Sequence, residues 1–313
     1  MNFRYGFFAI LLAAAALSCA QTCCAQTDAA QTETKIVVDT TLVVIPVTVT
    51  DPTNRFVLGL EKEDFTIFED GVQQKITQFS GEDAPLSVGI VIDTSGSMGL
   101  KMDTSHRAVT EFLKTMNAQD EAFLIQFSDQ AEVVQQFTGN TREIESRMGK
   151  LQSGGLTALL DAVELGVREM KKAKNPRKAL VVVSDGGDNH SRYTATDIRD
   201  IVKEADTQIF AFGVFDPVIF PQWSSEEVSG PRLLAQIADQ TGGRAFGAGQ
   251  FSQLPGVAEK IAIELRNQYV LAYAPTNAER DGKYRKVEVK VHQPATLPAL
   301  KARWRLGYYA PSQ

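Results

Sequence analysis

The sequence predicts an α/β fold: a doubly wound, mostly parallel sheet inserted into an all-β sandwich that the two flanks build together. Three observations lead to this prediction. Short apolar runs at 86–92 and 179–183 are typical of strands buried on both faces in a parallel sheet. Between 86 and 265 such runs alternate with stretches of helical periodicity. Both flanks instead show the two-residue period of half-buried strands.

The first 25 residues have the pattern of a secretory signal peptide. Arg4 precedes a long apolar run that ends in small residues, with cleavage expected after Ala20 or Ala25. A lipid anchor at the Leu17-Ser18-Cys19 segment is the weaker alternative, because the apolar residue of a lipoprotein box is one position off. The leader holds all three cysteines of the chain, so no disulfide is expected in the folded part. Residues 26–35 lack periodicity and are expected to form a flexible tether.

Composition limits the class of partner. The chain has 313 residues, 43% hydrophobic and 22% charged, which is enough for about two domains. The formal net charge is −6, and removing the leader with Arg4 makes it −7 (−6 minus +1). An acidic chain without a basic stripe is a poor nucleic-acid binder, and no later apolar run is long enough to span a membrane. We therefore expect a secreted or periplasmic protein without a transmembrane helix.

Residues 36–82 are expected to form the N-terminal half of the sandwich. Segment 36–50 alternates and is rich in Val and Thr, with Pro46 favouring an edge position or a bulge. Segments 65–68 and 74–79 flank Asp70-Gly71, a pair that supplies the positive φ of a tight hairpin. This flank carries too little apolar material to fold alone.

Residues 86–265 are expected to form the α/β domain. Pro231 in the first turn and Gly242-Gly243 at the end set the bounds of one helix. An insertion at 217–229, of unassigned role, separates that helix from the preceding strand. Beside the two buried runs, strands are expected at 121–127, 131–137 (an antiparallel edge), 208–215 and 244–246, and helices at 102–116, 141–151, 157–172, 196–205, 231–241 and 253–265.

Residues 266–311 return to the two-residue period. Strands are expected at 268–273, 284–291 and 303–309, with a turn at 275–282. Neither flank has a core of its own, so we expect the two to pair into one β-sandwich.

Polar side chains follow the strand expected at 86–92. Asp93, Ser95 and Ser97 occupy alternate positions of a loop that Gly96 lets turn tightly, so one carboxylate and two hydroxyls can converge on one point. Oxygen-only ligands suit Mg²⁺, Ca²⁺ or Mn²⁺. Taken alone, the same residues would also fit a helix-capping loop. The pattern resembles the metal-ion-dependent adhesion site (MIDAS) of von Willebrand factor type A domains, whose signature is Asp-x-Ser-x-Ser after the first strand.

The resemblance implies a Rossmann-like sheet and two further ligands, a threonine on a second loop and an aspartate on a third. Thr157, just before a helix, and Asp185, just after the strand at 179–183, match these positions. Without the resemblance, Thr157 would be interpreted as a helix cap and Asp185 as the first residue of a turn. In the family the hydroxyls bind the cation directly and the carboxylates bind it directly or through water. The flanking segments resemble those of secreted bacterial VWFA-related proteins, notably from acidobacteria.

The resemblance implies a non-catalytic, adhesion-type module. Neutral hydroxyl ligands leave the ion electrophilic, so an acidic side chain of a protein partner can complete its coordination. Asp188 and His190 are possible secondary residues near this site.

Two other functions remain open from the sequence. One is a divalent-metal-dependent hydrolase, although no nucleophile elbow surrounds Ser97 to make a triad with His106, and position 95 lacks the second aspartate of a haloacid dehalogenase-type phosphatase. The other is a purely structural ion site in an envelope scaffold protein.

Overall fold

The computed structural model describes residues 42–214, 225–248, 254–292 and 299–312. They form one six-stranded, mostly parallel sheet and two four-stranded antiparallel sheets, which confirms the expected fold class. The expected signal peptide and tether lie outside the described residues, as do residues 217–224 of the 217–229 insertion. Within the described ranges, no helix has the length and apolar character needed to cross a membrane.

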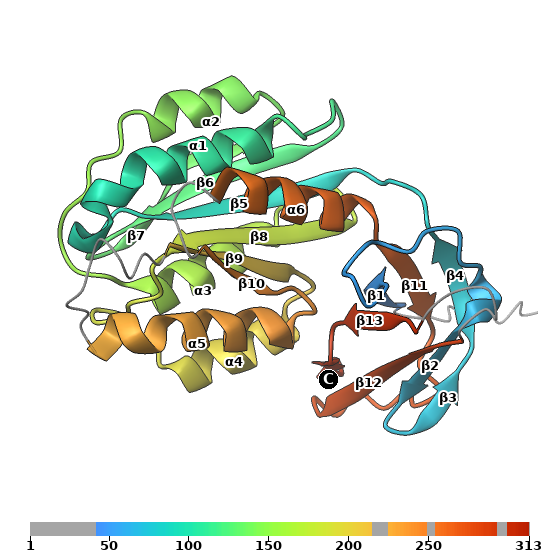
Figure 1. The fold of residues 1–313 in the computed structure, drawn as a ribbon. Helices are drawn as coiled ribbons and strands as arrows, with labels where there is room; N and C mark the ends of the chain where they lie inside the picture. The colour runs from blue at the N-terminus through green and yellow to red at the C-terminus, as the bar shows by residue number, and fades with distance from the viewer. Residues whose placement is uncertain (1–41, 215–224, 249–253, 293–298, 313) are drawn as a thin grey trace, which may run out of the picture. The chain divides into compact units, whose positions relative to one another are not determined.

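Both antiparallel sheets combine strands from the two flanks, which have the blue and red ends of the colour scale in Figure 1. One sheet has the order β13-β1-β11-β4 and the other β14-β12-β2-β3, so each mixes both flanks. Their shared core includes Ile45, Ile67, Leu271 and Val289, all fully or almost fully buried. The strands are β1 (Val43–Thr50), β2 (Phe65–Glu69), β3 (Val72–Gln74), β4 (Ile76–Ser80), β11 (Tyr269–Tyr273), β12 (Tyr284–Val291), β13 (Lys301–Trp304) and β14 (Gly307–Tyr309).

A buried carboxylate joins the two flanks inside this core. Glu69 of β2 accepts hydrogen bonds from the hydroxyls of Tyr273 in β11, at 2.7 Å, and Tyr308 in β14, at 2.8 Å. Burial, followed by the neighbouring carboxylate, raises the pKa of both tyrosines, so both stay protonated donors.

Three details of the flanks differ from the sequence prediction. The strand β1 lies inside its sheet and not at the edge, but β13 pairs only with the second half of β1. Pro46 lies in the first half, where β11 is the one neighbour among the described strands, so the missing N–H of the proline is tolerated. The segment expected as one strand at 303–309 divides into β13 and β14, which belong to different sheets. Arg305 lies at the break, and its buried side chain donates to the carbonyls of Gly307 and Lys203. The expected tight turn at Asp70-Gly71 is present, with φ values of 47° and 83°, and joins β2 to β3. The second strand expected at 74–79 is divided, because β3 ends at Gln74 and β4 belongs to the other antiparallel sheet.

The six-stranded sheet has the order β10-β9-β8-β5-β6-β7. All its pairings are parallel except that of β6 with β7, the expected antiparallel edge. Every residue of β5 is buried, as expected for a central strand. Its strands are β5 (Leu86–Asp93), β6 (Glu121–Phe127), β7 (Ala131–Thr138), β8 (Arg177–Ser184), β9 (Gln208–Val214) and β10 (Ala245–Ala248).

Helices cover both faces of this sheet (Figure 1). One face packs against α1 (Met102–Leu113), α2 (Thr141–Met148) and α6 (Leu254–Arg266). The other packs against α3 (Leu159–Met170), α4 (Ala195–Glu204) and α5 (Ser225–Gln240). This is the doubly wound arrangement that the alternating pattern predicts.

The start of α5 was wrongly predicted. The helix begins at Ser225, six residues before Pro231, which therefore lies inside it. A tertiary contact explains the difference: a Cβ atom on Gly230 would come within 2.6 Å of the Asp185 carbonyl oxygen, so the turn before Pro231 packs directly on the loop after β8. The division of the chain into domains at 82, 86, 265 and 311 stays a prediction.

Candidate functional site

The candidate site lies at the carboxyl ends of β5 and β8. These two strands are parallel neighbours at the point where the chain order changes direction in the sheet, with β6 on the other side of β5. In open α/β sheets, ligands bind in the crevice at such a point. Asp93 ends β5, and Asp185 directly follows β8.

The carboxylate of Asp93 is completely buried and held by neighbours on both strands. Its Oδ1 accepts from the backbone N–H of Ser95 at 2.9 Å, and its Oδ2 accepts from the hydroxyl of Ser184 at 2.6 Å. The Ser184 oxygen in turn accepts from the N–H of Gly186 at 2.9 Å. Asp93 therefore fixes both the loop after β5 and the loop after β8.

The two serines of the first loop come together. Ser95 is buried and Ser97 is exposed, and their hydroxyl oxygens are 3.2 Å apart. Two adjacent ligands of an octahedral ion with bonds of about 2.1 Å are about 3 Å apart. The spacing of these hydroxyls thus fits two neighbouring positions on one small cation.

Backbone hydrogen bonds hold the loop of Thr157 against the first loop. The N–H of Gly96 donates to the Gly155 carbonyl at 3.1 Å, and the N–H of Gly154 donates to the Thr94 carbonyl at 2.8 Å. Gly155 has a φ of +81°, and the Asp129 carboxylate packs beside it while accepting from the N–H of Leu156 at 2.9 Å. Position 155 therefore needs glycine for both its backbone conformation and its neighbour.

The loop after β8 completes the arrangement. The Thr157 carbonyl accepts from the N–H groups of Asn189 and His190, at 3.0 and 3.1 Å, and the Asn189 side chain accepts from the Thr157 N–H at 2.9 Å. Thr157 is buried. The three loops that carry the five predicted ligands are thus tied to one another.

The two possible secondary residues have other roles. Asp188 accepts from the hydroxyl of Ser191 at 2.5 Å and from the N–H of Leu160 at 3.3 Å, so it caps the first turn of α3. Its burial raises the pKa of the carboxyl group. The ring of His190 is exposed and lines a separate surface pocket beside Asp129 and Arg192.

Lys101 is part of the site, although the sequence analysis did not include it. Its ammonium Nζ lies 2.8 Å from Asp185 Oδ2, and both side chains are at most 5% exposed. Asp93, Asp185 and Lys101 together carry a formal charge of −1 (−2 plus +1). Burial, and then the charge of Asp185, raises the pKa of Asp93 to about 7.

The donor set fits a hard divalent cation. It contains two carboxylates and three hydroxyls, with no nitrogen or sulfur, which are the ligands that Mg²⁺ and Ca²⁺ prefer. Among the described residues, no group of three or more His, Cys, Asp or Glu could hold a metal ion. The candidate site is of another kind, because three of its five candidate ligands are hydroxyls. A cation would also relieve the repulsion between the two buried carboxylates.

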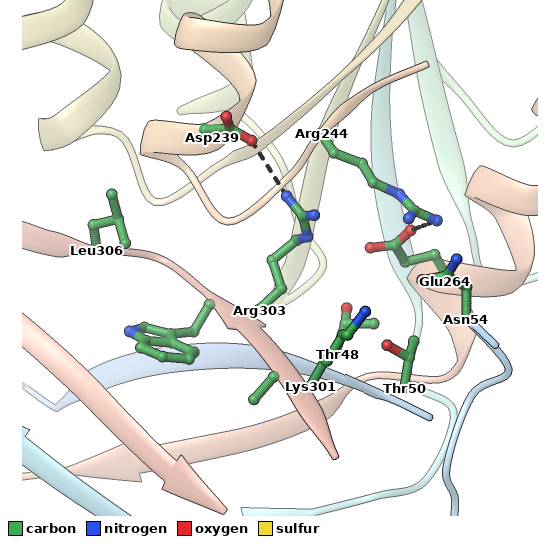
Figure 2. A pocket seen from close by; sticks show the side chains of 11 residues that line it. Thr48, Thr50, Asn54, Asp239, Arg244, Glu264, Lys301, Arg303 and Leu306 are labelled. Atoms are coloured by element: carbon green, nitrogen blue, oxygen red, sulfur yellow. Dashed lines mark hydrogen bonds and ion pairs between the residues drawn. The ribbon is translucent and has the colours of Figure 1, made fainter. Parts of the chain in front are cut away.

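A pocket of about 500 Å³ lies between the β13–β1 edge and the ends of α5 and α6. Its two acids have basic partners: Glu264 lies 2.7 Å from Arg244, and Asp239 lies 3.2 Å from Arg303. Figure 2 marks both pairs with dashed lines. The acids of this pocket thus already have cationic partners, so the strand-end site is the better candidate for binding a cation.

Besides Lys101, the sequence analysis missed Ser184, Asp129 and Asn189, which orient the candidate ligands. For Lys101, the one signal in the sequence was its position in the Gly- and Met-rich segment directly after the serine cluster. Ser184 precedes Asp185 and reads as the end of a buried strand, and the other two are ordinary turn residues.

Comparison with known proteins identifies the type of domain that carries this site. The family model of the von Willebrand factor type A domain matches residues 88–187. An uncharacterized protein of Synechocystis is 29% identical over 110 residues, covering 34% of this chain and 26% of that protein. Inter alpha-trypsin inhibitor heavy chain 4 of Mus musculus is 28% identical over 146 residues, covering 42% of this chain and 16% of that protein. An uncharacterized protein of Borreliella burgdorferi is 22% identical over 216 residues, covering 59% and 63%.

The chain thus spans less than two thirds of the length of each of these relatives. Among solved structures, proximal thread matrix protein 1 from the mussel byssus has a TM-score of 0.50 and 16% identity, covering 63% of this chain and 51% of that one. A von Willebrand factor type A protein of Catenulispora acidiphila has a TM-score of 0.49 and 13% identity, covering 86% and 75%. At these identities the likeness concerns the fold alone.

Proposed function

Because this chain is a von Willebrand factor A-type domain protein, we propose that it is a non-catalytic binding module. In this proposal Asp93, Ser95, Ser97, Thr157 and Asp185 hold Mg²⁺, or Ca²⁺ or Mn²⁺ in its place. A protein partner binds by placing an acidic side chain on that ion. The expected leader makes the protein secreted or periplasmic.

One observation supports the proposal: the three loops that carry the proposed oxygen ligands are joined by hydrogen bonds at a switch point of the sheet. The Ser95 and Ser97 hydroxyls are 3.2 Å apart, and the loops of Asp93, Thr157 and Asp185 are joined by hydrogen bonds. A small ion needs near-ideal ligand geometry, and pre-positioned ligands lose little entropy when it binds.

The exposure of Ser97 supports a role in binding a partner. Asp93, Ser95 and Asp185 are buried, whereas Ser97 lies at the surface. An ion bound between these residues would have a coordination position facing the outside, where a protruding carboxylate can reach it. The bound ion would supply electrophilic attraction for that carboxylate.

A purely structural ion is the weaker alternative. The three loops already have direct links, including the Lys101–Asp185 ion pair and the Asp93–Ser184 hydrogen bond. These contacts can hold the loops without an ion, which favours an ion with a role in binding over a purely structural one.

Catalysis has less support. Within the described part of the chain, the hydroxyl of Ser97 contacts that of Ser95, and His106 Nε2 is buried without a hydrogen-bond partner. Burial lowers the pKa of His106. A serine hydrolase needs a base within hydrogen-bond reach of its nucleophile.

Calorimetric titration of the chelator-treated protein with Mg²⁺ tests the ion site. We expect binding by the wild type and at least about tenfold weaker binding by Ser97→Ala and Thr157→Ala, since each removes one oxygen ligand. Ser146→Ala, which changes an exposed serine of α2, serves as the matched control. Absence of divalent binding by the wild type would refute the ion site.

Capture from the native cell envelope, with and without chelator, tests the partner. Immobilised wild type should retain a protein in Mg²⁺ and release it in chelator, while Ser97→Ala retains none. Mg²⁺-dependent hydrolysis by the pure protein, abolished by Asp93→Ala, would move the assignment to an enzyme.

A further inference from the structure

Lys101 occupies an unusual position for a lysine. Its side chain is 5% exposed, whereas lysines are almost never buried unless they are paired. The backbone is fixed where the 3-10 helix Gly96–Lys101 meets α1, and the Ser105 hydroxyl donates to the Lys101 carbonyl at 3.0 Å. From there the ammonium reaches Asp185 on another loop, at 2.8 Å.

The pair reduces the negative charge available to an ion. Without Lys101, the two buried aspartates would offer a charge of −2 to a divalent cation. With Lys101 the formal charge is −1, and an ammonium stands close to one of the candidate ligands. A positive charge in a buried, low-dielectric place repels a second cation strongly.

We propose that Lys101 is an internal counter-cation that keeps the ion-free site intact and lowers its affinity for divalent ions. The proposal rests on the proposed function, because it concerns the ion of the same site. Its consequence is an exchangeable ion: the loops stay in place when the ion leaves, and occupancy follows the Mg²⁺ concentration outside the cell.

The energetic argument has two sides. In the ion-free protein, Asp185 would be a buried carboxylate without a cation if Lys101 were absent, which is strongly destabilising. In the ion-bound protein, Lys101 is a second positive charge beside Mg²⁺ and opposes binding. Removing the ammonium should therefore weaken the fold in chelator and tighten ion binding.

The test compares the wild type with Lys101→Met in Mg²⁺ calorimetry and in thermal unfolding with and without chelator. We expect the association constant for Mg²⁺ to rise at least about tenfold in Lys101→Met. This is a lower bound, because Coulomb's law gives a much larger effect for a unit charge beside a divalent ion even at an effective dielectric constant of about 20. The variant should also unfold at a lower temperature in chelator and gain more from Mg²⁺ than the wild type does.

Two further variants separate charge from shape. Lys101→Arg keeps the charge and should bind Mg²⁺ within about threefold of the wild type. Lys150→Met makes the same change in net charge on an exposed residue and should leave the affinity unchanged. Should Lys101→Met fail to fold in chelator, Lys101→Gln, which keeps a hydrogen-bond donor without the charge, is measured in its place.

The outcomes distinguish the two proposals. If the wild type binds Mg²⁺ and the neutral variants bind it equally or more weakly, the role of Lys101 is refuted and the ion site stands. If neither the wild type nor the neutral variants bind, both proposals fail. A neutral variant that folds only with Mg²⁺ supports the inference, whereas failure of both neutral variants to fold even in Mg²⁺ overturns it.

Discussion

Replacing Asp93 by Asn should stabilise the ion-free protein, although Asp93 is a proposed ligand. Asp93 is fully buried, and its pKa is raised from 3.8 to about 7, so the fold disfavours the charged form. At pH 8 the ionised carboxylate then costs about 4 kcal/mol relative to the unfolded chain, at 1.36 kcal/mol for each pH unit. Asn removes this cost and keeps the shape.

Hydrogen bonding offsets part of the gain. Asn can still accept from the N–H of Ser95, but the second oxygen, which accepts from Ser184, becomes an amide nitrogen. Because the Ser184 oxygen already accepts from Gly186, we subtract about 1–2 kcal/mol. The expected net stabilisation is about 2–3 kcal/mol, or about 5–10 °C in Tm.

The pH dependence has a definite sign. The folded pKa lies above the unfolded one, so the folded protein binds more protons between about pH 4 and pH 7. The contribution of Asp93 is fully present below pH 4 and is lost as the pH rises through 7. In chelator, the advantage of Asp93→Asn should therefore grow from pH 5 to pH 8.

Urea unfolding in chelator at several pH values measures this difference. The matched control is Asp200→Asn, which makes the same chemical change on the exposed face of α4 and should stay within about 0.5 kcal/mol of the wild type. Equal or lower stability of Asp93→Asn at pH 8, or a difference that does not vary with pH, would refute the reasoning.

Three further predictions concern single contacts. In urea unfolding, Asp185→Asn should lower the free energy of unfolding by about 3–5 kcal/mol, because it removes the carboxylate that pairs with buried Lys101. This change is opposite to the one expected for Asp93→Asn, and a change of the same sign in both variants would contradict the prediction. Tyr273→Phe should cost about 1.5–3 kcal/mol by the same assay, since the hydroxyl donates to buried Glu69, with Tyr309→Phe as the control. Gly186→Ala should cost more than about 2 kcal/mol and weaken Mg²⁺ binding in calorimetry, because φ is +81° and the new Cβ would lie 2.5 Å from the Gly230 carbonyl carbon. Gly154→Ala, with open space around it, should have little effect on either measurement.

The architecture was predictable where apolar periodicity is strong. The run Leu86–Asp93 is apolar enough to identify the central strand, and all eight residues are buried. The interleaving of the flanks followed from their lack of separate cores. The start of α5 was missed because local propensity places Pro231 in a first turn, whereas the backbone contact between Gly230 and Gly186 is tertiary.

The candidate site was predictable as a set of ligand types, but its electrostatics were not. Asp93, Ser95 and Ser97 stand close together in the sequence, so their spacing alone suggests a cation site. Lys101 contacts Asp185, 84 residues away, and nothing local marks the lysine as buried. Asp188 looked like an additional acid, and only its hydrogen bonds to α3 and Ser191 reveal a helix cap.

The interleaved flanks have a consequence for the order in which the protein can form. Ser80 of β4 pairs with Val270 of β11, which leaves the ribosome 190 residues later (270 minus 80). At about 5–20 residues per second, β4 waits about 10–40 s for β11. Strands β1 and β2 wait slightly longer for their partners in the C-terminal flank, whereas β3 pairs with β2 in a local hairpin. During that time their edges are open to pairing with other chains. The α/β insert has mostly nearer partners and can close first, so the sandwich is the last part of the molecule to assemble.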